Sequence, residues 1–330
     1  MQTEAVIFTA VGQADVQTVD VPDPGPGQVQ VRTRYSTISA GTEGWILHNR
    51  FTWAPTQYPC IPGYQRVGVV AAVGPEVTGW AVGDRVMATR SGWPAPLTAQ
   101  SGAHAALGNT PAPELYRVPD TVHDVDAAGT VVAQVGYNAA QRAQIAPGDW
   151  AVVYGDGLIG QCAAQAIRAR GARVILVGHR AERLALAAQH SADGVINSHE
   201  QDVVEAVRRQ IGAETVTVVL DSVQAESAQR EYVPLLARGQ GQIVYCGFTP
   251  GTVWADMALL QQREVTTHFV SGWNRPRMDA TLALMAAGKL SLQPLITHLT
   301  PYRDGAAMYR MIAEKREAFL GITLDWTAQP

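Results

Sequence analysis

Residues 155–160 carry the motif G-x-G-x-x-G, with Asp, Leu and Ile at its variable positions. The motif directly follows the apolar run Trp150–Tyr154 and precedes Leu158–Arg170, which has the spacing of an amphipathic helix. In a strand–turn–helix context the first glycine permits a tight turn, the second lets a pyrophosphate approach the backbone, and the third lets the helix pack on the sheet. The free N–H groups of the helix N-terminus then face the phosphates. The pattern predicts a dinucleotide-binding site.

Short apolar runs continue to alternate with helical stretches after the motif. The predicted strands are Trp150–Tyr154, Val174–Val177, Val216–Leu220 and Gln242–Tyr245, and the predicted helices are Leu158–Arg170, Glu182–Gln189, Asp202–Ile211 and Glu226–Arg238. This alternation is typical of a buried parallel sheet with crossover helices. We therefore expect an α/β protein whose central part is a doubly wound Rossmann domain.

The first 120 or so residues have a different rhythm. Ala5–Phe8, Gln28–Thr33 and Val67–Gly74 read as short strands separated by Pro- and Gly-rich turns, which indicates a mostly β domain. The C-terminal part is predicted to be helical at Met278–Lys289 and Gly305–Glu314, and strand-like at Leu320–Leu324.

The end of the second predicted Rossmann strand bears on the choice of cofactor. An NAD site normally has Asp or Glu there to bind the ribose hydroxyls, whereas this chain has Gly178, His179 and Arg180. Arg180, with His179 and Arg183 nearby, suits the 2′-phosphate of NADP, so we expect NADP and regard NAD as the weaker alternative. A solvated loop with incidental charge is the other interpretation. The predicted cofactor-binding residues are Gly155, Gly157, Leu158, Ile159, Gly160, Gly178, His179, Arg180, Cys246 and Gly247.

Charge and composition exclude several classes of partner. The 330 residues include 25 basic and 29 acidic side chains, for a net charge of −4, which gives no general attraction for nucleic acid or an anionic membrane. No apolar run approaches the ~18 residues of a membrane span, and the first residues do not resemble a secretory signal. We expect a soluble cytoplasmic protein. The three isolated cysteines argue against a disulfide framework or a four-cysteine zinc lobe.

In addition, an ordered set of landmarks resembles the medium-chain dehydrogenase/reductase superfamily over nearly the whole chain. They are residues 39–43 (Ser-Ala-Gly-Thr-Glu), 59–65 (Pro-Cys-Ile-Pro-Gly-Tyr-Gln), 67–70, 83–86 (Gly-Asp-Arg-Val), the glycine motif and 292–298. Among its branches, the first two landmarks are most similar to the bacteriochlorophyllide 3-hydroxyethyl dehydrogenase branch. The resemblance implies a GroES-like catalytic domain, residues 1–122 and 273–330, around a Rossmann domain, residues 123–272. It also implies a homodimer in which Val265–Val270 pairs with its counterpart.

The chain departs from its zinc-dependent relatives at the metal positions. Those relatives have Cys, His and Glu where this chain has Ala40, Tyr64 and Gln65. A further zinc ligand of those relatives would fall near Val131 in this chain. None of these replacements is a normal zinc ligand, so we expect no metal.

Without zinc, hydride transfer still needs a hydrogen-bond or proton donor for the developing oxyanion or enolate. Thr42 matches the hydroxyl that relays protons in the zinc relatives, and Tyr64 offers a phenol. These two residues are the first catalytic candidates, and Glu43 and His48 are further candidates for a relay, with structural roles as the alternative for Tyr64, Glu43 and His48.

Aromatic residues gather in the segments expected to wall the cleft: Trp45, Phe51, Trp53, Tyr58 and Trp93. They favour a bulky apolar or aromatic substrate, although they also suit the core of a small β domain. We expect a zinc-independent NADP(H)-dependent oxidoreductase acting on a carbonyl/alcohol or activated alkene. The alternatives are a quinone-oxidoreductase-like or enoyl-reductase-like activity, or a non-catalytic protein that senses NADPH or has a structural role.

Overall fold

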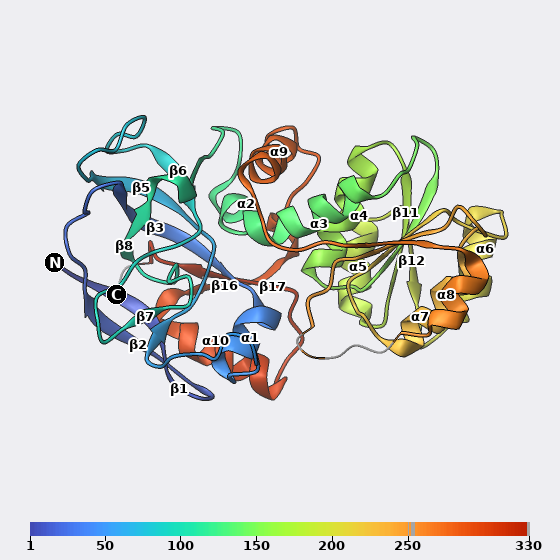
Figure 1. Ribbon diagram of the computed structural model, residues 1–330, viewed down its shortest axis with the longest axis horizontal. Coiled ribbons are helices and arrows are strands. Elements are labelled where there is room, and N and C mark those ends of the chain that lie inside the picture. Colours follow the sequence, from blue (N-terminus) through green and yellow to red (C-terminus); the bar gives the residue numbers. More distant parts are fainter. Residues whose placement is uncertain (250, 252–254, 329–330) are drawn as a thin grey trace. The chain divides into compact units, whose positions relative to one another are not determined.

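The computed structural model describes residues 1–249, 251 and 255–328, and divides the chain into two compact units. Residues 1–131 and 296–330 form the first unit, and residues 132–295 form the second (Figure 1).

Among the residues that the structure describes, the first unit contains two β-sheets. One sheet has the order β2-β1-β4-β7, and the other has the order β16-β17-β3-β5-β6-β9, with β8 also paired to β3. Their bounds are β1 Gln2–Ala10, β2 Gln13–Asp20, β3 Gln28–Ile38, β4 Cys60–Ile61, β5 Arg66–Val73, β6 Arg85–Ala88, β7 Thr98–Ala99, β8 Leu107–Pro111, β9 Leu115–Arg117, β16 Ile296–Pro301 and β17 Gly321–Asp325.

The C-terminal strand returns to this unit and completes its larger sheet. β17 pairs antiparallel with β3, where Ile322 lies opposite Ile38, and parallel with β16. Both of these isoleucines are buried, which ties the end of the chain to the N-terminal core. The helices of the unit are α1 Ala40–Leu47, α2 Asp124–Ala128, α10 Gly305–Glu314 and the short 3₁₀ turns η1 Ala112–Glu114 and η4 Tyr302–Asp304.

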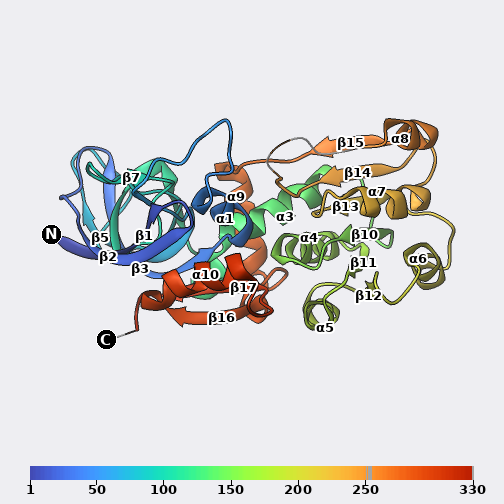
Figure 2. The ribbon, with the colours of Figure 1, turned by 90° about the horizontal axis from the view of Figure 1, so that it is seen from below.

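The second unit contains a six-stranded parallel sheet. Its order is β12-β11-β10-β13-β14-β15, which Figure 2 shows with β12 and β15 at opposite edges. The bounds are β10 Trp150–Tyr154, β11 Arg173–Gly178, β12 Gly194–Asn197, β13 Val218–Asp221, β14 Gln242–Tyr245 and β15 Thr266–Phe269. In chain order this is the Rossmann arrangement 3-2-1-4-5-6, with its switch point between β10 and β13. The prediction of a doubly wound sheet is confirmed.

Helices connect these strands. They are α3 Thr130–Arg142 (which begins at the unit boundary), α4 Leu158–Ala169, α5 Ala181–His190, α6 Val203–Ile211, α7 Glu226–Tyr232, α8 Met257–Arg263 and α9 Arg275–Ala286, with 3₁₀ turns η2 Val233–Leu235 and η3 Gln293–Leu295. The helix predicted over Glu226–Arg238 is shorter in the structure. Pro234, which has no N–H to donate, lies in η2 immediately after α7.

The division between the units differs from the predicted boundaries. Residues 273–295, assigned from the sequence to the first domain, lie in the second unit. Their attachment is local to that unit: the N–H of Ser291 donates to Oε1 of Gln165 at 2.7 Å, and Nε2 of Gln165 donates to the Ser291 carbonyl at 3.0 Å. Gln165 lies in α4, so these bonds hold the segment against the Rossmann helices.

In the described part of the chain, no helix is both long enough and apolar enough to cross a membrane.

Candidate functional site

The glycine turn after β10 has the geometry that the motif predicts. Gly155 has φ +115°, which side chains rarely tolerate, and a Cβ on Gly160 would lie 2.0 Å from the Gly155 carbonyl oxygen. Gly157 is the N-cap of α4, and a Cβ there would meet nothing within 4 Å. The turn therefore places Leu158 and Ile159 at an open helix N-terminus, which fits a dinucleotide pyrophosphate.

Cys246 and Gly247 lie across the switch point, after β14. Their N–H groups donate to the Asp221 carbonyl at 2.8 and 3.2 Å, and a Cβ on Gly247 would come within 2.8 Å of the Ser222 carbonyl oxygen. Ser222 in turn donates its hydroxyl to the Tyr154 carbonyl at 2.8 Å, beside the glycine turn. The two predicted residues thus belong to the same carboxyl-end edge of the sheet as the motif.

The end of β11 holds a carboxylate that sequence reasoning missed. Oδ2 of Asp156 accepts hydrogen bonds from the backbone N–H groups of His179 and Arg180, both at 3.0 Å. Its Oδ1 pairs with Nη1 of Arg180 at 3.2 Å and with Nη1 of Arg183 at 3.3 Å. The expectation that no carboxylate stands here is therefore wrong. Two features of the sequence could have indicated this carboxylate: Asp156 is an acidic residue inside the glycine motif, and Gly178 at the strand end has no side chain.

Backbone N–H groups and two arginine charges together set the electrostatics at this strand end. Burial by itself raises the pKa of the Asp156 carboxyl, but the N–H groups of Arg180 and His179 and the two guanidinium charges bring its pKa below the ordinary value. Burial and the Arg180 charge lower the pKa of His179, whose ring stacks on His199 with centroids 4.8 Å apart. Asp156 is therefore ionised and His179 neutral at pH 7.

In the first unit, the structure brings Thr42 and Tyr64 together. The Tyr64 phenol lies close enough to the Ser39 and Thr42 side chains at the start of α1 for both to lower its pKa, and both Thr42 and Tyr64 are partly exposed. Burial and the nearby Glu43 charge raise the pKa of Tyr64, and the two hydroxyl contacts only partly offset this. The phenol keeps its proton at neutral pH and can donate it in a hydrogen bond.

Glu43 lies behind this pair and is fully buried. Its Oε1 accepts the Ser39 N–H at 3.1 Å, and its Oε2 accepts hydrogen bonds from Nε2 of His104 at 3.0 Å and from the Tyr309 hydroxyl. Burial and Glu43 raise the pKa of Tyr309 well above its ordinary value. The Glu43 carboxylate is thus committed to three internal donors and fixes the first turn of α1, which carries Thr42.

His104 is the second residue whose role sequence reasoning missed. Its ring is fully buried, and Nδ1 lies 2.8 Å from Oγ of Ser36, which also accepts Nε1–H of Trp326 at 2.8 Å. The sequence predicts no role for His104. Its apolar flanks, Ala103 and Ala105, were the one signal that it is a core residue.

His48 lies at the other end of α1. It is the C-cap of that helix, and its ring packs beside Gly12 in the turn between β1 and β2. Six residues of helical rise, roughly 9 Å, separate it from Thr42 along the axis. The structure does not bring His48 to the hydroxyl pair.

The residues at the family's zinc positions do not fit a zinc ion. Ala40 has no donor atom, Tyr64 is engaged with Ser39 and Thr42, and the buried Gln65 donates its amide to the Thr37 carbonyl at 3.1 Å. Within the described residues, no three His, Cys, Asp or Glu side chains are grouped to hold a metal. This donor set lacks the thiolates and imidazoles that a tetrahedral zinc site requires.

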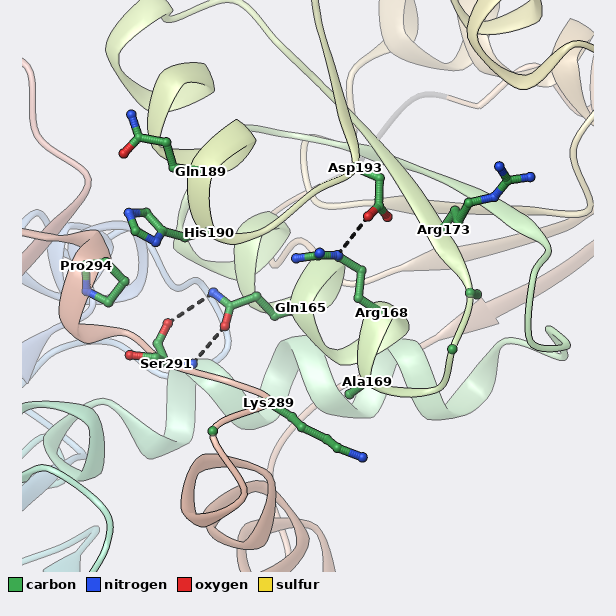
Figure 3. Close-up of a pocket in the computed structure, with 13 residues that line it drawn as sticks. Gln165, Arg168, Ala169, Arg173, Gln189, His190, Asp193, Lys289, Ser291 and Pro294 are labelled. Carbon is green, nitrogen blue, oxygen red and sulfur yellow. Dashed lines mark hydrogen bonds and ion pairs between the residues drawn. The ribbon is translucent and has the colours of Figure 1, made fainter.

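An open cavity of about 790 Å³ lies at the opposite, amino-terminal edge of the Rossmann sheet (Figure 3). Arg168 and His190 line it from the last turns of α4 and α5. A cation such as Arg168 at a helix C-terminus complements the helix dipole, which accounts for its placement without a ligand. There, Asp193 pairs with Nε of Arg168 at 3.1 Å and accepts the Val174 N–H at 2.8 Å.

Comparison with known proteins matches both parts of the chain. The family model described as alcohol dehydrogenase GroES-like domain matches residues 25–120, and the one described as zinc-binding dehydrogenase matches residues 159–287. The chain belongs to the medium-chain dehydrogenase/reductase superfamily. The mostly β unit of this dehydrogenase/reductase is accordingly its GroES-like domain.

Relatives span the whole length of this medium-chain dehydrogenase/reductase. The 2-desacetyl-2-hydroxyethyl bacteriochlorophyllide A dehydrogenase of Cereibacter sphaeroides is 28% identical, with 99% of each chain covered. An Escherichia coli alcohol dehydrogenase complexed with NADH has a TM-score of 0.84 at 22% identity, covering 98% of this chain and 99% of that one. A Sinorhizobium meliloti protein bound to NADP has a TM-score of 0.86 at 21% identity, with the same coverage.

Proposed function

We propose that this chain is a zinc-independent oxidoreductase that transfers hydride between NADP(H) and a carbonyl/alcohol or activated alkene of a bulky hydrophobic substrate. The observation that carries the proposal is the Thr42–Tyr64 hydroxyl pair, which replaces metal-ligand chemistry with a hydrogen-bond donor. Superfamily membership and the glycine-turn geometry support the dinucleotide part.

The dinucleotide would be held by the carboxyl-end edge of the Rossmann sheet. The helix N-terminus at Leu158 and Ile159 suits the pyrophosphate, and Arg180 and Arg183 suit a 2′-phosphate. A bound nicotinamide supplies or accepts the hydride. Similar structures carry NADH in one case and NADP in another, so the preference for NADP rests on the two arginines.

The protein's own contribution is the placement of a proton donor. Tyr64 stays protonated at neutral pH, and the Ser39 and Thr42 side chains lie near its hydroxyl. In the reductive direction this hydroxyl donates a hydrogen bond to the oxygen on which negative charge develops. In the oxidative direction the protonated phenol accepts a hydrogen bond from the alcohol, and the alcohol proton leaves to solvent. Glu43, held by His104 and Tyr309, is a positioning residue for α1.

An aromatic cluster in the first unit supports a bulky substrate. Trp45 and Phe51 meet edge to face with centroids 5.9 Å apart, and Phe51 contacts Trp53 at 5.1 Å. Trp53 is 60% exposed whereas Phe51 is buried, so the aromatic surface that this cluster offers to a ligand is mainly that of Trp53.

A homodimer is part of the proposal. β15 is an edge strand of the Rossmann sheet, and Phe269 on it is 75% exposed while stacking on Tyr245. An exposed edge that is rich in β-branched and aromatic residues needs a partner, and a second copy of the same strand provides one. The cytoplasmic location stays a prediction.

The test uses protein purified without added metal. NADPH absorbance is followed with bulky aromatic ketones, quinones and enones, before and after chelation, and zinc is measured by elemental analysis. We expect NADPH oxidation with at least one substrate, unchanged by chelation, and well under one zinc per chain. NADPH binding without turnover of any substrate would favour a sensor, and stoichiometric zinc with chelation-sensitive activity would overturn zinc independence.

A further inference from the structure

Asp156 fills the space that a side chain at position 178 would occupy. A Cβ on Gly178 would lie 2.6 Å from Cβ and 2.7 Å from Oδ2 of Asp156. The carboxylate at the end of β11 therefore comes from the turn after β10, the neighbouring strand of the parallel sheet. An acidic residue at position 178 itself would collide with it.

The contacts of this carboxylate are all internal. Two backbone N–H groups and two guanidinium groups engage its oxygens, and the side chain is only 4% exposed. Arg183 is 15% exposed and Arg180 is 45% exposed, so the anchored guanidinium of Arg180 still faces water. One carboxylate thus orients both arginines at the strand end.

The local charge follows from this arrangement. The two guanidinium groups carry two positive charges and Asp156 carries one negative charge, because its pKa is lowered. The net charge of the three groups is +1 at neutral pH, against nearly two negative charges on a 2′-phosphate. The same carboxylate that positions the arginines also weakens their field.

We propose that Asp156 is the specificity-determining residue for the adenosine 2′ position, because it holds Arg180 and Arg183 in place and offsets one of their charges. The site then accepts a 2′-phosphate with a restrained preference and leaves the unphosphorylated nucleotide competitive. This inference rests on the proposed dinucleotide-binding function. The inference adds Asp156, which lies outside the strand-end segment in the sequence, to the residues that set nucleotide specificity.

The test compares two nucleotides that differ only in the 2′-phosphate. Adenosine 2′,5′-bisphosphate and adenosine 5′-monophosphate are titrated by calorimetry into wild type and Asp156→Asn. Asn keeps the size of the side chain and removes the charge. We expect the affinity ratio of bisphosphate to monophosphate to rise about tenfold, with a steeper dependence on salt.

Asp193→Asn is the matched control. Asp193 also accepts a backbone N–H and pairs with an arginine, but it lies at the amino-terminal end of β11, so its variant should leave the ratio unchanged. Thermal unfolding and circular dichroism confirm that each variant is folded.

Arg183→Gln is a second test variant, which keeps the inference testable if Asp156→Asn does not fold. With Asp156 kept, we expect it to lower the ratio about tenfold.

A ratio that stays constant or falls in folded Asp156→Asn overturns the inference, as does an unchanged ratio in Arg183→Gln. The readout does not depend on which nucleotide the wild type prefers. Failure of both nucleotides to bind the wild type would overturn the dinucleotide function itself, whereas binding of both with an unresponsive ratio removes only the role of Asp156.

Discussion

The imidazole of His104 lies directly over the Cα of Gly63: a Cβ on Gly63 would come within 2.6 Å of the ring. Gly63 has φ +90° and immediately precedes Tyr64. This contact holds His104 where it reaches Glu43. Gly63, the neighbour of Tyr64, therefore also supports the buried Glu43–His104 contact that fixes the helix turn carrying Thr42.

Gly63→Ala should therefore destabilise the protein through two effects, the positive φ and the collision with His104. Gly79→Ala is the matched control, because Gly79 has φ +82° but a Cβ there meets nothing within 4 Å. We expect both variants to lose about 1–2 kcal/mol from backbone strain, and Gly63→Ala to lose about 1–3 kcal/mol more from overpacking. Urea denaturation measures the difference, and equal losses would contradict the contact.

Tyr64→Phe and Thr42→Val should lower turnover while NADPH affinity stays near wild type. Removal of a positioned proton donor typically costs about 10²–10⁴-fold. Tyr302→Phe is the control in the same unit, since its hydroxyl bonds Glu4 and lies in no proposed site. Steady-state kinetics and cofactor titration separate the two effects. Wild-type turnover in both Tyr64→Phe and Thr42→Val would remove the hydroxyl pair from the mechanism.

Arg180→Ala should weaken NADPH binding about tenfold and leave NADH nearly unaffected, because one charge-assisted contact is lost at a partly exposed site. Fluorescence titration of both cofactors checks this. Tighter binding of NADH than NADPH by the wild type would count against the NADP assignment.

The pH dependence of that preference follows from His179. Its protonated form attracts a phosphate, and burial and Arg180 lower its pKa below the ordinary 6.5, with His199, Arg183 and Asp156 also facing it. The gain in NADPH preference should therefore appear only below pH 6.5 in the wild type. In Arg180→Ala the loss of a neighbouring positive charge should move that gain to higher pH. A preference that is flat from pH 7.5 to 5.5 would exclude a role for His179.

Tyr309 should contribute to alkaline unfolding. Its pKa is raised in the folded protein, so its neutral form is favoured there, and its contribution to stability is present below the unfolded value of 10.0 and is lost as pH rises above it. Between pH 10 and 11 the free energy of unfolding should fall more steeply for the wild type than for Tyr309→Phe, by up to about 1.4 kcal/mol per pH unit. Parallel urea titrations at each pH measure the slopes, and identical slopes would contradict the assignment.

Phe269→Lys should convert the proposed dimer to a monomer, because a charge on β15 opposes pairing with a second copy. Val82→Lys is the control, since Val82 is 69% exposed and lies in the other unit. Light scattering at micromolar concentration reports the mass. A monomeric wild type would end this part of the proposal.

Local pattern was sufficient to predict several elements of both units. The strands Trp150–Tyr154 and Gln242–Tyr245 and the helix Gly305–Glu314 have the predicted bounds. Apolar runs and helical periodicity are properties of consecutive residues, and in the glycine motif Gly160 has no room for a Cβ because of the Gly155 carbonyl oxygen five residues before it. The steric demand on Gly155 comes instead from the distant Ser222. In contrast, α3 was not predicted, and the unit boundary near residue 295 depends on the distant Gln165–Ser291 bonds.

The candidate sites also contain some residues that local sequence identified and others that only long-range contacts bring together. The family resemblance selected Thr42 and Tyr64, and their position at the end of a predicted strand selected Gly178 and Arg180. Only the tertiary structure joins Glu43 to His104 and Tyr309, which are 61 and 266 residues away along the chain. Only the pairing of β10 with β11 places the Asp156 carboxylate beside Gly178. Hydrogen bonds and charges act over a few ångströms of space whatever the distance in sequence, so these partners were decided by how the strands pair and pack.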